Sequence, residues 1–500
     1  MTDKPRRTPD LLAAVDLGSN SFHLVVARFS HGQLTIVDRL REAVRLAEGL
    51  DLHNRLSGPA VARAMACLER FGQRLRALES DSVRAVGTQA LRTARRKAGF
   101  LERARAALGH PIEIISGSEE ARLVYVGVAM STPSEGKRRL VLDIGGGSTE
   151  VVIGEGAGIS VLESLDMGCV SMGMRFFADG KLTEKRFRRA RLAARLELEP
   201  IRAKFLKTGW DDAVGSSGMV RAIADVSREL EPNEPSITLA AVERMIEKAN
   251  QAERLSDLKL PALTEDRLAV LPGGLVILAE LLDVFSIKGL RAADGGLREG
   301  LLYDMVGRIT NEDVRVRSVR AMGRRFHVDG EQAARVSKTA AELLAQVKGS
   351  WELEDPLAEQ MLAWAAELHE VGLDLSHSRY HLHGAYVVEN ADMPGFGREE
   401  QRLLAALIRG HRRRVTLERV EELLPPWDTR AEFLVILLRI AVLLHRGRDM
   451  APQDVKALAK GRTLTLEFPQ KWLGDHPLTT TDLLQEAEYL RALDFRLRVV

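Results

Sequence analysis

The chain has 500 residues, more than one hydrophobic core can serve, so we expect three or four domains. Its composition, 45% hydrophobic and 28% charged, is that of an ordinary globular protein, and two cysteines exclude a disulfide framework. The net charge is only +2, but basic residues are clustered, which leaves room for a polyanionic ligand. The start of the chain lacks the apolar segment of a signal peptide, and the longest apolar run, Phe433 to Leu444, is too short to span a bilayer. We therefore expect a cytoplasmic protein, at most peripheral at the inner membrane.

The first predicted element is a strand that ends at Asp16, followed by a glycine turn at residues 18–21 and a second strand at 24–26. A turn with few side chains can close on a ligand with its N–H groups pointing inward, and phosphate is the natural ligand for that arrangement. The same pattern also fits a plain β-hairpin, in which glycine only supplies the turn conformation.

A helix is predicted at residues 59–78 and a strand at 83–86. The turn after this strand contains Thr88 and is followed one helical turn later by Arg92. A guanidinium in that position can hold phosphate oxygens bidentately, although Arg92 could equally be a surface residue of the helix.

The next strand, at 111–115, leads into a helix for which Ser118 is the predicted N-cap. Glu119 and Glu120 lie in the first turn, where acidic residues usually complement the helix dipole. Two carboxylates after a glycine-containing loop could instead leave one in a cleft as a base. The residues alone do not choose between the two.

The stretch from 140 to 154 repeats the order of the first hairpin. A buried strand ends at Asp143, a glycine turn occupies 145–148, and Glu150 begins the next strand. Asp143 follows Asp16 by 127 residues, and the same spacing relates the glycines and serines of the two turns. Two such units predict a duplicated fold in which both turns, with Asp16 and Asp143, face one cleft. A carboxylate at a strand end suits Mg²⁺, which takes few protein ligands and completes its shell with water and phosphate oxygens.

The second half continues with a long helix at 184–205, a small-residue turn at 213–218, an apolar helix opening at 271–274 and a strand at 287–290. Strands that alternate with helices in two halves predict an α/β architecture of paired domains.

From about residue 311 the pattern changes to amphipathic helices, at 318–327, 331–347, 356–369 and 399–409. The last fifty residues alternate as strands at 463–468 and 495–500. We expect domain boundaries that give the segments 11–123, 124–310, 311–446 and 447–500.

Together these motifs resemble those of the exopolyphosphatase/guanosine pentaphosphate phosphohydrolase (Ppx/GppA) family. The resemblance covers essentially the whole chain and is carried by AAVDLGSNSFHLVVAR at 13–28, VGTQALR at 86–92, IEIISGSEEARLVYVGV at 112–128, LVLDIGGGSTEVVIGE at 140–155, DGGLREG at 294–300 and WAAELHEVGL at 364–373. It implies two actin-like domains of the sugar kinase/Hsp70/actin type, then an all-helical HD-like domain and a small α+β C-terminal domain.

The resemblance also implies a role for each matching residue. Glu120 matches the catalytic glutamate, and Asp143 and Glu150 match acidic residues that organise Mg²⁺ and the attacking water. K⁺ is a candidate monovalent cation. The glycine turns match phosphate loops, so the expected phosphate-binding residues are Gly18, Ser19, Asn20, Ser21, Thr88, Arg92, Gly145, Gly146, Gly147 and Ser148.

The expected activity is that of a Mg²⁺-dependent exopolyphosphatase, which removes terminal orthophosphate from inorganic polyphosphate without a covalent phosphoenzyme. The alternative is a guanosine pentaphosphate phosphohydrolase, which would use the same site on a nucleotide. A sugar kinase and a non-catalytic polyanion-binding or RNA-binding scaffold stay open, because fold alone does not exclude them. The resemblance implies a homodimer, and nucleic acid is not an expected partner.

The helical domain departs from the HD pattern of a histidine, an adjacent His-Asp pair and a distant aspartate. Here the pair is His369-Glu370, and the distant position is occupied by Val442, which cannot ligate a metal. We therefore expect no catalytic metal in this domain. Its basic cluster, Arg412, Arg413 and Arg414, is expected to line a channel that grips polyphosphate; a solvated helix end is the alternative.

Overall fold

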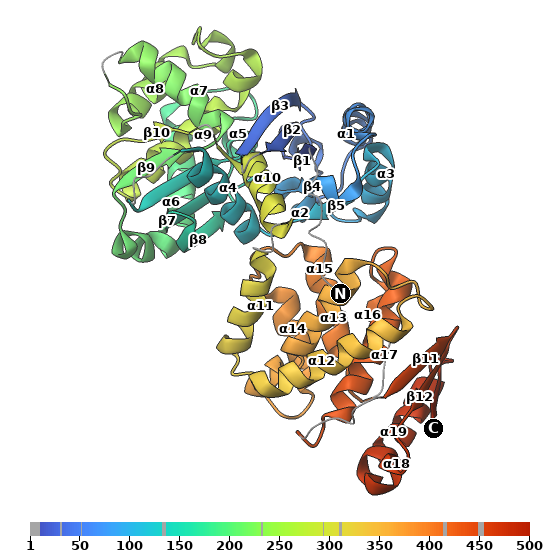
Figure 1. Cartoon of the computed structure of the whole chain (residues 1–500). Coiled ribbons are helices and arrows are strands. Elements are labelled where there is room, and N and C mark those ends of the chain that lie inside the picture. The colour runs from blue at the N-terminus through green and yellow to red at the C-terminus, as the bar shows by residue number, and fades with distance from the viewer. Residues whose placement is uncertain are drawn as a thin grey trace. The chain divides into compact units, whose positions relative to one another are not determined.

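The computed structural model describes residues 11–30, 33–51, 53–132, 137–231, 234–293, 295–309, 313–413, 418–448 and 455–500. The chain divides into two compact units, one ending at Asp313 and the other beginning at Val314 (Figure 1). Among the described residues, no helix is both long enough and apolar enough to cross a membrane.

The first unit contains two five-stranded sheets with the same topology. Their strand orders are β3-β2-β1-β4-β5 and β10-β9-β6-β7-β8. In each sheet the first strand pairs antiparallel with the second and parallel with the fourth. The internal duplication predicted from the sequence is therefore confirmed in the sheets. The strands are β1 (Leu11–Leu17), β2 (Phe22–Ser30), β3 (Gln33–Glu42), β4 (Val83–Gly87), β5 (Ile112–Ile114), β6 (Arg139–Ile144), β7 (Thr149–Glu155), β8 (Gly158–Leu165), β9 (Asp212–Gly215) and β10 (Arg291–Ala292).

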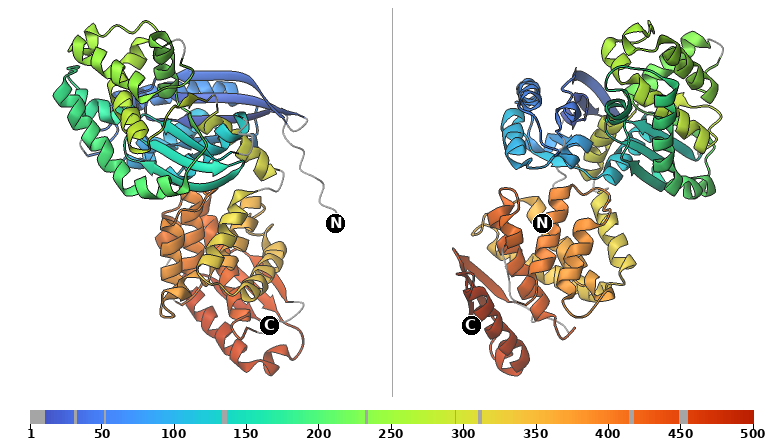
Figure 2. Two further views of the ribbon diagram at one scale, coloured as in Figure 1. Left: turned by 90° about the vertical axis from the view of Figure 1, so that its left-hand side faces the viewer. Right: turned by 180° about the vertical axis from the view of Figure 1, so that it is seen from behind.

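Helices and sheets of this unit alternate in layers. On the outer face of the first sheet lie α1 (Gly58–Leu75) and α3 (Ala98–Leu108). Between the inner faces of both sheets lie α4 (Gly117–Ser131) and α10 (Leu297–Ile309), which Figure 1 shows side by side. The outer face of the second sheet carries α5 (Cys169–Phe177), α6 (Glu184–Thr208), α7 (Gly218–Leu230), α8 (Leu239–Ala252) and α9 (Glu265–Val284). In Figure 2 the blue and green outer helices lie on opposite sides of the unit.

Strand alternation decides which side chains enter the central layer. In β1, Leu12 and Ala14 pack against α4 and α10, whereas Val15 packs outward. In β6, Val141 packs inward and Leu142 outward. Every second residue of each strand therefore faces the central layer.

The two central helices cross at backbone contact. A Cβ placed on Gly300 of α10 would lie 1.9 Å from the carbonyl oxygen of Leu123 on α4. A Cβ on Gly127 would lie 2.0 Å from the carbonyl oxygen of Gly296. Glycine is therefore required on both helices, because any side chain at the crossing would push them apart. The boundary predicted between residues 123 and 124 falls inside α4 and stays a prediction.

The start of α9 was predicted wrongly. The helix begins at Glu265 rather than at residue 271, and Pro272 and Gly273 lie inside it. Close packing explains the glycine, since a Cβ on Gly273 would lie 2.2 Å from the carbonyl oxygen of Cys169 on α5.

The strand predicted at 287–290 is also displaced. The last strand of the sheet forms at Arg291–Ala292, where it pairs with β9. Leu290 instead exchanges two backbone hydrogen bonds with Ile237, as an isolated bridge outside the sheet.

The second unit consists of helices followed by a three-stranded sheet of order β11-β12-β13. One hydrophobic cluster extends from the first helices to the sheet, so that Leu464 and Leu497 share a core with the helices. The boundary predicted between residues 446 and 447 stays a prediction. The elements are α11 (Val314–Arg325), α12 (Gly330–Val347), α13 (Pro356–Leu368), α14 (Tyr380–Asn390), α15 (Arg398–Gly410), α16 (Glu418–Glu421), α17 (Trp427–Leu444), β11 (Lys456–Lys460), β12 (Thr463–Glu467), α18 (Trp472–Asp475), α19 (Pro477–Arg491) and β13 (Arg496–Val499).

The glycine crossing predicts a large difference between two glycine-to-alanine changes. Gly300→Ala should lower the stability of the protein by about 1–3 kcal/mol or more, because the new methyl group has no space beside Leu123. Gly99→Ala is the control, since its Cβ would meet nothing within 4 Å and helix propensity favours alanine. Thermal unfolding followed by calorimetry measures both. Equal midpoints for the two variants would contradict the tight crossing.

Candidate active site

Four polar residues lie at the ends of strands that face the central layer. Asp16 continues the inner face of β1, and Asp143 continues that of β6. Asp16 is the Cα partner of His23 on β2, and Asp143 is the partner of Glu150 on β7. His23 and Glu150 are also 127 residues apart, so the duplication places an imidazole in one half where the other half has a carboxylate.

The two glycine turns lie against each other, as predicted. A Cβ on Gly146 would lie 3.1 Å from the Cβ of Ser19, and one on Gly147 would lie 3.0 Å from its Oγ. Asp143 is near enough to Asp16 to contribute to raising its pKa. The two halves therefore bring their strand ends together, and we call this region the cleft, as predicted from the sequence.

Several backbone carbonyl groups of the two turns are bonded to neighbouring segments. The carbonyl oxygens of Ser19 and Asn20 accept from the segment at 45–47, and that of Gly146 accepts from the first turn of α5. Within the described residues, the N–H groups of Ser19, Asn20, Gly146 and Gly147 have no acceptor. Free N–H groups in two facing turns fit the predicted binding of phosphate oxygens.

The first turn of α4 holds the two candidate glutamates. The N-cap is Ser116 rather than the predicted Ser118, because the Oγ of Ser116 accepts the N–H of Glu119. Both carboxylates are buried. Their partners differ, and this difference separates their roles.

Glu119 belongs to a buried ion-pair network. Arg122 donates to both of its oxygens, at 2.7 and 2.8 Å, and also to Asp304 of α10 at 2.6 Å. Arg84 of β4 donates to the other oxygen of Asp304 at 2.5 Å. The network joins α4, α10 and β4. Glu119 is therefore assigned a structural role, because its carboxylate is already bound by arginine.

Glu120 points into the cleft instead. Its carboxylate accepts from Arg92 of α2 (Gln89–Thr93) at 2.6 Å, and its charge raises the pKa values of Asp143 and Glu150. Arg92 also donates to Gln89, which in turn donates to Asp166. A carboxylate and a guanidinium therefore lie together beside the glycine turns, which suits a base and a phosphate ligand. The predicted Thr88 is buried at the start of α2.

The carboxylates of the cleft repel one another. Burial, opposed by Arg298 and reinforced by the charges of Glu120 and Asp143, raises the pKa of Asp16 to about 7. Burial and Glu120 raise the pKa of Asp143 to about 7, although Ser216 donates to it at 3.1 Å. Burial and the same neighbours raise the pKa of Glu150 well above its ordinary value.

The donor set fits the Mg²⁺ that the family resemblance implies. Oδ1 of Asp16 is buried without a hydrogen-bond partner among the described residues, and Glu120 and Asp143 crowd it with like charge. No three His, Cys, Asp or Glu residues converge as a complete metal site in the described parts of the chain. Mg²⁺ needs only one or two carboxylates when water and phosphate oxygens complete its shell. Asp143 and Glu150 would hold the ion, and this assignment stays a prediction.

A cationic cluster near Asp16 and Asp143 surrounds His23. Arg41 is its Cα partner on β3, and Arg221, Arg267 and Arg298 come from the first turns of α7, α9 and α10. All four arginines lower the pKa of His23, after the larger effect of burial. None of them forms an ion pair with a carboxylate of the described residues. Burial and the neighbouring arginines also lower the pKa of Arg267.

Sequence reasoning missed this cationic cluster. The motif DGGLREG contains Arg298, and the 127-residue spacing singles out His23, so both signals were present. Arg41, Arg221 and Arg267 carry no comparable signal, because they belong to three separate elements that only the fold brings together.

In the helical unit, no three His, Cys, Asp or Glu among the described residues converge as a metal site. His369 is buried with Nδ1 bonded to the carbonyl oxygen of Ala366, and Glu370 is paired with Arg448 at 2.8 Å. The absence of a catalytic metal here stays a prediction. Arg412 lies over the ring of Tyr380 at 4.8 Å. Arg413 is exposed, and Arg414 lies outside the described residues, so the polyphosphate channel also stays a prediction.

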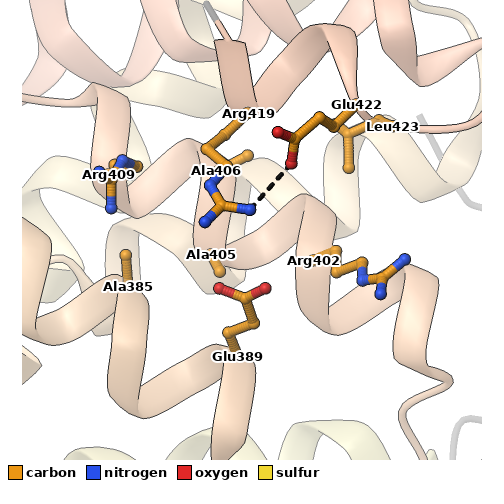
Figure 3. Close-up of a pocket in the computed structure, with 9 residues that line it drawn as sticks. All are labelled: Ala385, Glu389, Arg402, Ala405, Ala406, Arg409, Arg419, Glu422 and Leu423. Atoms are coloured by element: carbon orange, nitrogen blue, oxygen red, sulfur yellow. Dashed lines mark hydrogen bonds and ion pairs between the residues drawn. The ribbon is translucent and has the colours of Figure 1, made fainter. Parts of the chain in front are cut away.

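A separate pocket of about 150 Å³ lies between α14, α15 and α16 (Figure 3). Arginine and glutamate side chains line it in nearly equal number, and Arg419 is paired with Glu422 at 2.8 Å. Such mixed and partly neutralised charge gives no preference for an anion. The candidate active site is therefore the cleft of the first unit.

The different partners of the two glutamates predict different defects. Glu120→Gln keeps the shape but removes the base, so kcat should fall by about 10²-fold or more while substrate binding persists. Glu119→Gln should lower thermal stability, because it leaves Arg122 partly unpaired, with a much smaller effect on kcat. Steady-state kinetics and thermal unfolding of both variants test this. Turnover by Glu120→Gln within a few-fold of the unaltered protein would contradict the role.

The raised carboxylate pKa values predict a pH-dependent stability. Between the ordinary pKa of 3.8 and about 7, folded Asp16 keeps a proton that the unfolded chain releases, so its contribution to stability falls as pH rises through 7. Asp16→Asn should therefore raise the Tm of the ligand-free protein by a few degrees at pH 8 and by much less at pH 5. Added Mg²⁺ should stabilise the unaltered protein more at pH 8, because the ion competes with protons. An equal effect of Asp16→Asn at both pH values would show that the carboxylate is not strained by its neighbours.

The chain matches known proteins along most of its length. Residues 25–309 match the model of the Ppx/GppA phosphatase family, and residues 314–487 match that of Ppx/GppA phosphatase, domain III. A guanosine-5'-triphosphate,3'-diphosphate pyrophosphatase from Vibrio cholerae is 40% identical over 478 residues, 95% of both chains.

Solved structures share the fold. The Aquifex aeolicus PPX-GPPA enzyme is 27% identical, with a TM-score of 0.50 over 58% of this chain and 98% of that one. An exopolyphosphatase from Cytophaga hutchinsonii, 23% identical, has a TM-score of 0.54 over 60% of this chain and 98% of its own. The predicted fold class, two actin-like domains followed by a helical domain and a small α+β domain, is confirmed. The chain belongs to the Ppx/GppA phosphatase family.

Proposed function

We propose that this phosphatase hydrolyses the terminal 5'-phosphate of guanosine 5'-triphosphate 3'-diphosphate (guanosine pentaphosphate) and releases orthophosphate. This reverses the order of the two substrates expected from the sequence, in which polyphosphate came first. The 40% identical relative from Vibrio cholerae, which covers 95% of both chains, supports the nucleotide.

The observation that carries the proposal is the cationic cluster around His23. Four arginines that form no ion pair with a carboxylate of the described residues surround His23, and two of them, Arg221 and Arg298, are close enough to lower the pKa of Asp143. A substrate with a single phosphate chain needs only the glycine turns. A substrate with a second phosphate group on the same sugar also needs cations beside those turns to bind that group. Charge-assisted hydrogen bonds from arginine match phosphate geometry and contribute about 1.5–3 kcal/mol each. The 3'-diphosphate gives the cluster a ligand.

In the proposed reaction the free N–H groups of the two turns hold the terminal phosphates. Arg92, which pairs with Glu120 at 2.6 Å, turns its donors to a phosphate oxygen and releases the carboxylate. Glu120 then accepts a proton from a water that attacks the terminal phosphorus. The bond between that phosphorus and the bridging oxygen breaks, and the diphosphate oxygen leaves with the nucleoside.

Most of the catalysis in such a site comes from positioning and from stabilising the charge spread over the transferred phosphoryl group. Mg²⁺ bound by Asp143 and Glu150 would neutralise part of that charge. The glycine turns contribute N–H donors that need no reorganisation. Hydrogen bonds from α5 and from the segment at 45–47 to the carbonyl groups already fix the backbone of the turns.

Inorganic polyphosphate stays the second candidate, because its terminal anhydride needs the same turns and the same base. Polyphosphate would extend from the site as a single chain of charges. Its binding would therefore depend on cationic residues along one path. The two substrates therefore place different demands on the cationic cluster.

A phosphate-release assay compares guanosine pentaphosphate, GTP and long-chain polyphosphate at equal concentrations of terminal phosphate. We expect the highest kcat/KM for guanosine pentaphosphate. A higher value for polyphosphate would overturn the proposal and restore the expectation from the sequence.

Removing two arginines of the cluster should change substrate preference. Changing Arg221 and Arg267 together to alanine should lower kcat/KM for guanosine pentaphosphate by about 10²-fold, because two charge-assisted hydrogen bonds are lost. The loss for GTP, which lacks the 3'-diphosphate, should be much smaller. Arg188→Ala, at an exposed position of α6, is the control. Equal losses on both nucleotides would assign the cluster to the 5'-phosphates.

A further inference from the structure

The hydrogen bond between Arg298 and His23 fixes the proton of the imidazole. Nη1 of Arg298 lies 2.9 Å from Nδ1 of His23. A guanidinium can only donate hydrogen bonds, so Nδ1 must be the acceptor and cannot carry a proton. The ring is therefore neutral, and its single N–H is on Nε2.

The surroundings of His23 favour the same state. Burial and the four neighbouring arginines hold its pKa well below the ordinary value, so that the neutral ring persists at physiological pH. Nε2 has no hydrogen-bond partner among the described residues and is not among the fully enclosed polar atoms. It is therefore a donor with a free hydrogen at the cleft.

The duplication gives His23 a position in the cleft rather than in the core. Its counterpart in the second half, Glu150, lies beside Asp143, as His23 lies beside Asp16. On the second sheet the row continues to Ser164, which donates to Glu150, and on the first sheet it continues to Arg41. Glu150 adds a second carboxylate beside Asp143, whereas His23 and Arg41 add hydrogen-bond donors beside Asp16.

We infer that His23 acts as a neutral hydrogen-bond donor to a phosphate oxygen of the substrate, and that Arg298 is a positioning residue that holds it in the Nε2–H tautomer. The inference rests on the proposed function for the identity of the nucleotide, but any phosphate substrate of this cleft would meet the same donor. A neutral donor is what the cluster can accommodate, because a fifth positive charge among four arginines would be repelled.

Nitrogen NMR of histidine-labelled full-length protein tests the tautomer without substrate. The His23 signals, assigned by their loss in His23→Gln, should show a protonated Nε2 and an unprotonated Nδ1 at pH 7. In Arg298→Met, which removes the donor but keeps the length of the side chain, the Nδ1 signal should shift because its hydrogen bond is lost. A protonated Nδ1 in the unaltered protein would overturn the inference.

Kinetics of three substitutions test the contact. Gln places an amide N–H near the position of Nε2, Asn places it near that of Nδ1, and Leu has neither. His23→Gln should keep kcat/KM within about 5-fold, whereas His23→Asn and His23→Leu should lower it by about 10–100-fold, as expected for a hydrogen bond to a charged group. His53→Gln, at an exposed histidine, is the control and should change nothing. Equal losses in His23→Gln and His23→Leu would show a structural role only.

The same variants are assayed with guanosine pentaphosphate and with polyphosphate, which separates the two proposals. If the protein prefers polyphosphate, the proposed function fails, and the ranking of the His23 variants is then measured on that substrate. If the ranking fails on the preferred substrate, the inference fails whichever substrate is turned over.

Discussion

The buried ion pairs between α4, α10 and β4 are the constraint on which the cleft depends. Arg122 bridges Glu119 and Asp304, and Arg84 holds the second oxygen of Asp304, so that three elements are joined within the central layer. Buried charges are costly unless every partner is in place, which makes the relative position of these elements strongly specified. Because α4 and α10 also touch at glycine, their first turns are held at a fixed separation between the sheets. Those turns carry Glu120 and Arg298, the base and the positioning residue of the proposed site.

The duplicated halves have diverged in charge while keeping their topology. Each sheet presents an aspartate at the end of its first strand and a second polar residue directly across on the next strand. In the second half that residue is Glu150, which adds a second carboxylate next to Asp143. In the first half it is His23, and its row continues into arginine. The second copy therefore has a carboxylate where the first has an imidazole next to an arginine, a difference that two identical copies would not produce.

Like charges crowd one another both among the carboxylates and around His23. The carboxylates raise one another's pKa values, and the arginines around His23 lower its pKa and that of Arg267. A cation would relieve the first strain and a phosphate group the second. Repulsion of both signs within one cleft is typical of a site that binds charged ligands. Its unfavourable free energy is offset by stabilising contacts in the rest of the fold. In this protein the ion-pair network and the glycine crossing hold the elements of the cleft in place despite that repulsion.

Local sequence determined the strands, the two glycine turns and their duplication, because alternation and turn chemistry act over a few residues. It also placed Asp143 and Glu150 on neighbouring strands, since a short hairpin fixes which residues face each other. It could not choose Glu120 over Glu119 without the resemblance, because that choice depends on Arg122 reaching Asp304, 182 residues away. Nor could it assemble the four arginines around His23, which come from four elements spread over most of the first unit. Sequence patterns describe neighbours along the chain, whereas the charge of this cleft is a sum over groups that only the packing of α4 and α10 between two sheets brings within reach of one another.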